Sequence, residues 1–142
     1  MKHVSRSLEE TGAIAREFLH TLEAGGEALV VSLEGDLGSG KTTFSQALGK
    51  ALGVEDTMQS PTFVLEKIYP IDYKGFKKLI HIDAYRLEKE SELTHLGWDE
   101  IVKDRENLIL LEWPERVAGL APKEARRITF KFIDETTREV SL

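Results

Sequence analysis

Cysteine is absent from this chain of 142 residues. Disulfide bridges, thiolate zinc sites and cysteine nucleophiles are therefore excluded, and the absence fits the reducing cytoplasm, where we expect the protein to be located. Long hydrophobic runs are absent as well, since every apolar stretch is far too short to cross a membrane. We see no signal peptide at the N-terminus. These absences predict a cytoplasmic protein with neither a membrane anchor nor a zinc site.

Basic residues are in the minority. The sequence holds 19 lysines and arginines against 25 aspartates and glutamates, for a formal net charge of −6. A protein whose main role is to grip nucleic acid usually needs a basic face, so we expect any contact with RNA to be indirect. Two small basic clusters, within 74–78 and 123–127, are interpreted as solvated surface. The length, with 41% hydrophobic and 31% charged residues, predicts one globular domain over residues 1–142.

The most informative stretch is residues 35–42, which read Gly-Asp-Leu-Gly-Ser-Gly-Lys-Thr. They match the phosphate-loop (Walker A) pattern G-x-x-x-x-G-K-[ST]. The short apolar run at 28–33 before the motif is typical of a strand buried on both faces. After the motif, apolar residues recur at helical spacing over 42–52, and Gly53 is a natural C-terminal stop. Strand, glycine loop and helix form the arrangement that this motif needs to hold a nucleotide.

Each position of the motif has a chemical reason. Gly35, Gly38 and Gly40 let the backbone turn tightly, so that successive N–H groups converge on one anion. The N-terminus of the following helix adds partial positive charge. Lys41 can reach the β- and γ-phosphates of a nucleotide, and the hydroxyl of Thr42 can take one position on Mg²⁺. The alternative, a turn that only caps a structural helix, gives no reason for Lys41 and Thr42 at these offsets.

A phosphate loop needs a carboxylate at the end of a buried strand to hold Mg²⁺ or its waters. Asp83 ends the apolar run at 79–82, and Glu112 ends the run at 108–111. We favour Asp83 as the nearer metal partner, while Glu112 holds a metal-bound water or orients the attacking water. The alternative for Asp83 is a turn or a helix cap, which aspartate often forms where it leaves a strand. ATP and Mg²⁺ are the expected ligands.

Three further residues have both a functional and a structural interpretation. Thr62 is a candidate sensor of the γ-phosphate, because its hydroxyl falls in the loop between the phosphate-loop helix and the next strand. An ordinary threonine at the start of a strand is the alternative. His81 lies on a strand, where a lone histidine is more often packing than catalysis. Arg86 is the best internal candidate for an arginine finger, with a surface salt bridge as its alternative.

The rest of the chain reads as alternating helices and strands. A capping box at Ser7 and Glu10 begins a first helix, whose apolar stripe from Leu8 to Leu22 ends before a Gly-Gly pair. Strands are expected at 63–69, 78–83 and 107–112, helical stretches at 91–96 and 115–120, and a hairpin at 128–133 and 138–142. Because turns join several strands, we predict an α/β, P-loop NTPase-like, three-layer domain with a mixed parallel/antiparallel sheet flanked by helices.

Four segments together resemble one family. They are residues 35–43 (Gly-Asp-Leu-Gly-Ser-Gly-Lys-Thr-Thr), 60–63 (Ser-Pro-Thr-Phe), 81–86 (His-Ile-Asp-Ala-Tyr-Arg) and 111–114 (Leu-Glu-Trp-Pro). In order and spacing they resemble TsaE, also called YjeE, the small bacterial ATPase family of tRNA threonylcarbamoyladenosine synthesis, over nearly the whole chain. The resemblance implies a Mg²⁺-dependent ATPase with Lys41 and Thr42 on the phosphates and metal. It also implies that Asp83 and Glu112 are essential acidic residues.

The resemblance implies partners as well. By similarity these are TsaD and TsaB, the homologous subunits that transfer threonylcarbamoyl to adenosine 37 of tRNAs reading codons that begin with A. The family member is thought to support turnover of that complex and not to carry the group itself. Contact with tRNA is therefore expected only through the complex.

Further nucleotide contacts are implied by the same match. Thr43 closes the phosphate-loop segment, and Ser39 stands where the family usually has alanine and can add a hydroxyl contact. Thr11 matches a threonine expected near the base or ribose, with packing in its helix as the alternative. Arg138 is a candidate nucleotide contact, although the residue before it is threonine where the family often has glycine. Trp113 stacks on a partner, lines the site or packs in the core.

Two other functions stay open. A small-molecule kinase would pass the γ-phosphate to an acceptor, which needs an acceptor pocket and usually an arginine-rich lid, and the sequence has no arginine-dense segment. A nucleotide-dependent binding switch would act through its partners, with hydrolysis incidental. For the ATPase itself, an incomplete site predicts slow hydrolysis by the protein alone and faster hydrolysis when a partner completes the site.

Overall fold

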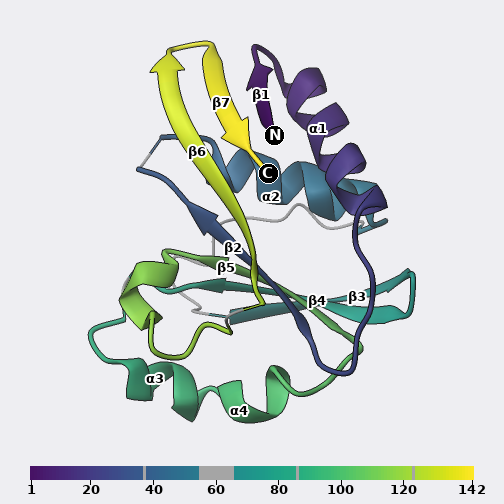
Figure 1. Ribbon diagram of the computed structural model, residues 1–142, viewed down its shortest axis with the longest axis vertical. Coiled ribbons are helices and arrows are strands. Elements are labelled where there is room, and N and C mark those ends of the chain that lie inside the picture. The colour runs from purple at the N-terminus through teal and green to yellow at the C-terminus, as the bar shows by residue number, and fades with distance from the viewer. Residues whose placement is uncertain (37, 55–65, 86, 123) are drawn as a thin grey trace.

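The computed structural model describes residues 1–36, 38–54, 66–85, 87–122 and 124–142. These residues form one seven-stranded sheet with helices on both faces (Figure 1). The elements in chain order are β1 (Lys2–Ser5), α1 (Leu8–His20), β2 (Leu29–Glu34), α2 (Lys41–Ala51), β3 (Glu66–Tyr73), β4 (Phe76–Asp83), α3 (Glu90–His95), α4 (Trp98–Ile101), β5 (Asn107–Glu112), the 3₁₀ helix η1 (Pro114–Val117), β6 (Arg126–Asp134) and β7 (Thr137–Ser141). The predicted α/β architecture is confirmed.

The sheet is parallel in its centre and antiparallel at its margins. The strands lie in the order β1-β7-β6-β2-β5-β4-β3. β5 pairs in parallel with β2 on one side and with β4 on the other, and β6 is parallel to β2. The pairs β1–β7, β6–β7 and β3–β4 are antiparallel. The predicted mixed sheet is therefore confirmed, and the carboxyl ends of β2, β4 and β5 meet at one edge.

Two apolar layers separate the sheet from its helices, which Figure 1 shows above and below it. On one face, α1 and α2 bury Phe18 and Phe44 together with Val31 of β2. On the other face, α3, α4 and η1 cover Val30 of β2 and Ile80 of β4. The neighbours Val30 and Val31 lie in opposite layers because successive side chains of a strand alternate. Helices on both faces explain why the central strands are nearly continuous apolar runs.

Three phenylalanines join α1, α2 and β6. The ring of Phe44 in α2 meets that of Phe18 in α1 with centroids 6.3 Å apart, and that of Phe130 in β6 with centroids 5.4 Å apart, both edge to face. Such pairs add about 0.5–1.5 kcal/mol beyond the area that they bury. The cluster therefore holds α2, which begins with Lys41 and Thr42, against the sheet.

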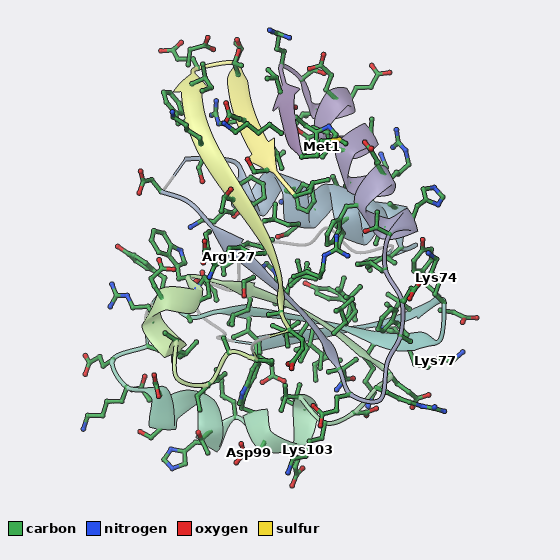
Figure 2. All side chains as sticks on the ribbon, in the orientation of Figure 1. Met1, Lys74, Lys77, Asp99, Lys103 and Arg127 are labelled. Atoms are coloured by element: carbon green, nitrogen blue, oxygen red, sulfur yellow. The ribbon has the colours of Figure 1, made fainter. Side chains whose placement is uncertain are left out.

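Two lysines of the first basic cluster serve the fold at the β3–β4 turn, where Figure 2 labels Lys74 and Lys77. Nζ of Lys74 donates to the carbonyl oxygen of His20 at 2.8 Å and to that of Leu22 at 3.1 Å, at the end of α1. The ammonium group offsets the partial negative charge of that helix terminus. Exposed Lys77 pairs with Asp72 at 3.0 Å. The cluster is surface that supports local structure.

Three elements differ from the sequence prediction. The expected helix at 115–120 is only the 3₁₀ turn η1, which follows Trp113 in a left-handed conformation with a φ of 59°. β1 and α4 are not among the predicted elements. Each has four residues, too few for a hydrophobic period to be recognised. β1 is formed through its pairing with β7 at the other end of the chain.

The boundaries of several predicted strands also changed, since β3 continues to Tyr73 and β4 begins at Phe76. β6 and β7 extend the predicted hairpin strands towards each other, and leave a shorter turn. Of the predicted strand at 63–69, residues 66–69 belong to β3, and residues 63–65 lie outside the described residues.

In the described parts of the chain, no helix is long and apolar enough to cross a membrane.

The predicted capping box starts α1. Oγ of Ser7 accepts from the backbone N–H of Glu10 at 3.1 Å, while the carboxylate of Glu10 accepts from the backbone N–H of Arg6. Leu8, assigned to the apolar stripe of this helix, is instead 78% exposed. It is the first residue of α1, outside the hydrophobic core, and it lines a cavity next to this helix.

Replacing Phe18 with alanine is expected to lower the free energy of unfolding by about 3–5 kcal/mol, because the buried ring would leave a cavity beside Phe44. Phe132→Ala is the matched control. Phe132 is 51% exposed, so its loss should cost less than about 1 kcal/mol. Urea unfolding followed by circular dichroism measures both values. Equal losses in the two variants would contradict the packing of α1 on this face.

Candidate functional site

A cavity of about 660 Å³ opens at the edge where the carboxyl ends of the parallel strands meet. Four parts of the chain line it: residues 5–8 and 11 from the end of β1 to the first turn of α1, residues 38–43 of the phosphate loop and α2, the ends of β4 and β5, and the β6–β7 hairpin. Pockets of 300–1,000 Å³ are typical of small-molecule sites. The cavity therefore has the size and position of a ligand site.

The glycines of the phosphate loop are needed for its backbone path. Gly35, Gly38 and Gly40 have φ values of 152°, 78° and 105°, which L side chains rarely adopt. At Gly35 a Cβ atom would lie 2.7 Å from the carbonyl oxygen of Phe130 and 2.7 Å from Oγ of Ser39. The loop thus passes against β6 at a point where only glycine fits.

The loop delivers the chain to the N-terminus of α2. The helix begins at Lys41, and its first turn contains no acidic residue. Its free N–H groups and partial positive charge therefore face the cavity without a carboxylate of that turn to occupy them. Thr42 and Thr43 line the cavity from the same turn. This end of α2 has the properties of an anion site.

Lys41 is a buried cation at the centre of the cavity wall, with 5% of its surface exposed. Its Nζ donates to the carbonyl oxygen of Gly35 at 2.5 Å and lies 3.3 Å from the centroid of the Trp113 ring. Burial lowers the pKa of Lys41 below its ordinary value, while the negative charges of nearby carboxylates, Glu112 first among them, act in the opposite direction. An anion in the cavity would favour the charged form.

Ser39 offers a further polar group. Its side chain is buried, and among the described residues its Oγ has no hydrogen-bond partner. A buried hydroxyl without a partner costs about 1–3 kcal/mol, so such an atom in a cavity wall suits a polar ligand. The hydroxyl contact predicted for Ser39 stays a prediction, and its side chain lines the cavity.

The two predicted carboxylates lie side by side. Asp83 ends β4 and Glu112 ends β5, and the parallel register places them directly opposite each other. Both line the cavity. Oδ1 of Asp83 accepts from the backbone N–H of Tyr85 at 3.0 Å, as in the turn that was its structural alternative. The same residue therefore shapes the turn after β4 and faces the cavity.

Glu112 has a partner that the sequence analysis did not assign. Its Oε2 pairs with Nε2 of His81, and both side chains are almost completely buried. His81 is buried, as the packing interpretation predicts. The bond to Glu112 was not predicted from the sequence. One signal was available: His81 and Asp83 are two residues apart on a strand, a spacing that places them on one face.

Trp113 and Tyr85 form an aromatic wall, with ring centroids 4.9 Å apart. Trp113 lines the cavity under the ammonium group of Lys41 and also packs against the apolar layer of α3 and α4. Two of its three predicted roles, lining the site and packing, therefore apply together. An ammonium group over the face of an indole ring is a favourable cation–π arrangement.

The opposite wall comes from both ends of the chain. Thr11 is buried, and its hydroxyl lies 2.6 Å from Oγ of Ser5. Arg138 donates from Nε to the carbonyl oxygen of Gly38 at 3.0 Å, and its guanidinium group lies over the ring of Phe132. Thr11 and Arg138 both line the cavity. Thr11 was among the predicted contacts, whereas sequence reasoning missed Ser5 at the end of β1.

The oxygen donors that line the cavity suit Mg²⁺, which is usually held by phosphates as well as by protein, better than a metal bound only by protein side chains. The described residues contain no group of three or more His, Cys, Asp or Glu side chains that could hold a metal ion. The hydroxyl of Thr42 and the carboxylates of Asp83 and Glu112 are hard oxygen donors around one cavity. Mg²⁺ is usually bound by one or two carboxylates together with substrate phosphates.

Of the predicted site residues, Thr62 lies outside the described residues, as does Arg86.

The sheet order, the phosphate loop and the strand-end carboxylates together define an α/β P-loop protein. The chain belongs to the TsaE family, because the family model of the threonylcarbamoyl adenosine biosynthesis protein TsaE matches residues 5–140. The resemblance drawn from the four sequence segments is thereby confirmed. The family takes part in the biosynthesis of tRNA threonylcarbamoyladenosine.

Individual relatives agree with this assignment. The tRNA threonylcarbamoyladenosine biosynthesis protein TsaE of Bacillus subtilis is 38% identical over 133 residues, which are 94% of this chain and 78% of that protein. The protein of the same name from Treponema pallidum is 33% identical over 142 residues, 100% of this chain and 99% of that one. The crystal structure of YdiB from Bacillus subtilis matches with a TM-score of 0.75 and 30% identity, over 99% of this chain and 82% of that chain.

Gly35→Ala is expected to destabilise the protein by about 1–3 kcal/mol more than Gly38→Ala, because the added Cβ would press against Phe130 and Ser39. Gly38 has a positive φ with nothing within 4 Å of its Cβ position, so its variant carries only the backbone cost, about 1–2 kcal/mol. Thermal and urea unfolding of the pair measure the difference. Equal destabilisation would mean that the loop can move away from β6.

Proposed function

We propose that this protein is a Mg²⁺-dependent ATPase that acts in the cytoplasm with TsaD and TsaB in the threonylcarbamoylation of adenosine 37 of tRNA. One observation supports the ATPase most strongly: Lys41 and Thr42 of α2, Asp83 of β4 and Glu112 of β5 line one cavity at a helix N-terminus. These are the groups that phosphoryl chemistry needs, and they come from three separate elements. Family membership supports the pathway.

The proposed roles follow from the positions of the side chains. The ammonium group of Lys41 neutralises charge on the β- and γ-phosphates, and the backbone N–H groups of the loop and α2 bind phosphate oxygens. Thr42 and Asp83 would hold Mg²⁺, which would supply further positive charge beside the phosphates when bound. Glu112 orients the attacking water or a metal-bound water. Thr11, Ser39, Thr43 and Arg138 contribute nucleotide contacts from the cavity walls.

Beyond Lys41, the described residues that line the cavity include two more cations, Arg6, which is exposed, and Arg138. Arg138 uses Nε on Gly38 and Nη1 on the carbonyl oxygens of Asp134 and Thr137, which ties its guanidinium group to the backbone. An arginine finger is commonly supplied by a partner in such enzymes. We therefore propose that hydrolysis is slow in the protein alone and is stimulated by the TsaD–TsaB complex.

The decisive experiment measures ATP hydrolysis with Mg²⁺, with the protein alone and with TsaD–TsaB and tRNA added. We expect stimulation by the complex, and a loss of about 10²–10³-fold in Lys41→Ala, as for removal of one charge-stabilising group. Lys50→Ala is the matched control, because Lys50 is an exposed lysine in the last turn of the same helix. Equal rates with and without the complex would contradict the proposed partners.

The same assay separates the two alternatives. A kinase would consume ATP only when an acceptor metabolite is added. A binding switch would keep its effect on the TsaD–TsaB reaction after Asp83→Ala or Glu112→Ala had abolished hydrolysis. A rate of roughly 10 per second by the protein alone, typical of independent enzymes, would contradict the incomplete site.

Nucleotide binding should take up a proton at alkaline pH. Burial lowers the pKa of Lys41 in the free protein, and bound phosphates would raise it again. Between the two pKa values binding is coupled to proton uptake, so ATP affinity falls as the pH rises through this window.

Isothermal titration calorimetry in buffers of different ionisation enthalpy measures this uptake across the alkaline range. Lys41→Met should abolish the alkaline component, whereas Lys50→Met should retain it. An uptake that persists in Lys41→Met would assign the titration to another group.

A further inference from the structure

His81 is a buried polar residue to which the proposed mechanism gives no role. It lies on β4, two residues before Asp83, and none of its surface is exposed. Its Nε2 pairs with Oε2 of Glu112, whose exposed fraction is 2%. Burying a carboxylate and an imidazole in contact costs free energy, because both groups lose their hydration. A functional role would explain why the fold retains this pair.

The sheet register explains how the two side chains meet. Leu79 and Leu110 lie in the apolar layer under α1 and α2, and strand alternation puts His81, Asp83 and Glu112 on that same face. In the parallel pairing His81 is level with Leu110, and Asp83 is level with Glu112. His81 therefore contacts Glu112 diagonally across the two strands, from the side of the core.

The chemistry of the pair defines which atom donates. A carboxylate only accepts, so the proton lies on Nε2 of His81 and is donated to Oε2 of Glu112. Within the described residues Nδ1 of His81 has no hydrogen-bond partner, and a second proton there would be a buried donor without an acceptor. The Nε2–H tautomer therefore suits the bond to Glu112.

We propose that His81 is a positioning residue that holds the carboxylate of Glu112 in the orientation needed for ATP hydrolysis. This inference rests on the proposed function. The terminal torsion of a glutamate is broad, so a carboxylate is free to turn unless something holds it. The bond from His81 occupies Oε2 and leaves Oε1 for a ligand in the cavity that Glu112 lines. Without this bond Glu112 can turn towards Lys41, the buried cation of the same cavity.

The test compares His81→Leu with His81→Gln in the ATPase assay with TsaD–TsaB and tRNA. Leucine removes the donor and keeps an apolar core, whereas the glutamine amide retains a donor in the ε position. We expect His81→Leu to lower kcat by about 10–100-fold, the usual effect of losing the support of an active-site ligand, with the ATP Kd nearly unchanged. His81→Gln should recover most of the loss. Ile80→Val, an adjacent buried change in the other apolar layer, is the control, and melting temperatures verify that all variants fold.

Two further measurements distinguish a positioning role of His81 from a general effect of His81 on the stability of the protein. In a Glu112→Gln background, His81→Leu should have almost no additional effect on kcat, because the group that it positions is already gone. The imidazole N–H of His81, observed by NMR of ¹⁵N-labelled protein, should shift in Glu112→Gln and stay in place in Ile80→Val. This NMR reading requires neither ATP nor partners.

The outcomes are distinct. If the wild type hydrolyses ATP and His81→Leu keeps its kcat, or if its effect adds fully to that of Glu112→Gln, His81 does not position Glu112 and the ATPase proposal stands. If glutamine fails to restore kcat in a folded variant, the donor role is likewise overturned. If the wild type shows no hydrolysis that depends on Lys41, the proposed function fails and this inference fails with it.

Discussion

Parallel pairing of β5 with both β2 and β4 is the constraint on which the site depends. The register places Leu33 of β2 and Asp83 of β4 level with Glu112 of β5. The phosphate loop therefore leaves β2 at the same edge where the two carboxylates end their strands. A slip of one residue in β4 would turn Asp83 and His81 to the opposite face. The slip is opposed because it would also exchange the two apolar layers that bury Leu79 and Ile80 on opposite sides.

The site gathers charges that the fold alone would have little reason to bury. Lys41 is buried at the start of a helix, where its own positive charge adds to that of the helix terminus. Glu112 is buried beside it, held by His81 from the core side. Each group costs free energy to bury, and the lowered pKa of Lys41 reflects that cost. Buried charges whose free-energy cost a bound ligand would offset are typical of functional sites.

The cavity is closed by segments that are far apart in the chain. Ser5 of β1 is level with Arg138 of β7, and Arg138 contacts Gly38, a hundred residues before it. Thr11 reaches the same wall through its hydroxyl contact with Ser5. The N-terminal strand and the C-terminal hairpin therefore act together on the phosphate loop. Leu8 lines the same cavity and is exposed to solvent.

The amino-acid sequence alone determined the phosphate loop, the class of fold and the family, because these depend on local patterns. Glycines at fixed offsets, a buried apolar run before them and helical spacing after them can be recognised without any distant contact. The two strand-end carboxylates were predictable for the same reason. Only the tertiary structure decided that His81 bonds Glu112, that Trp113 lies under Lys41, and that β1 forms a wall of the cavity. Those relations arise from strand register and from pairing between the two chain ends, and register is set by packing across the whole sheet.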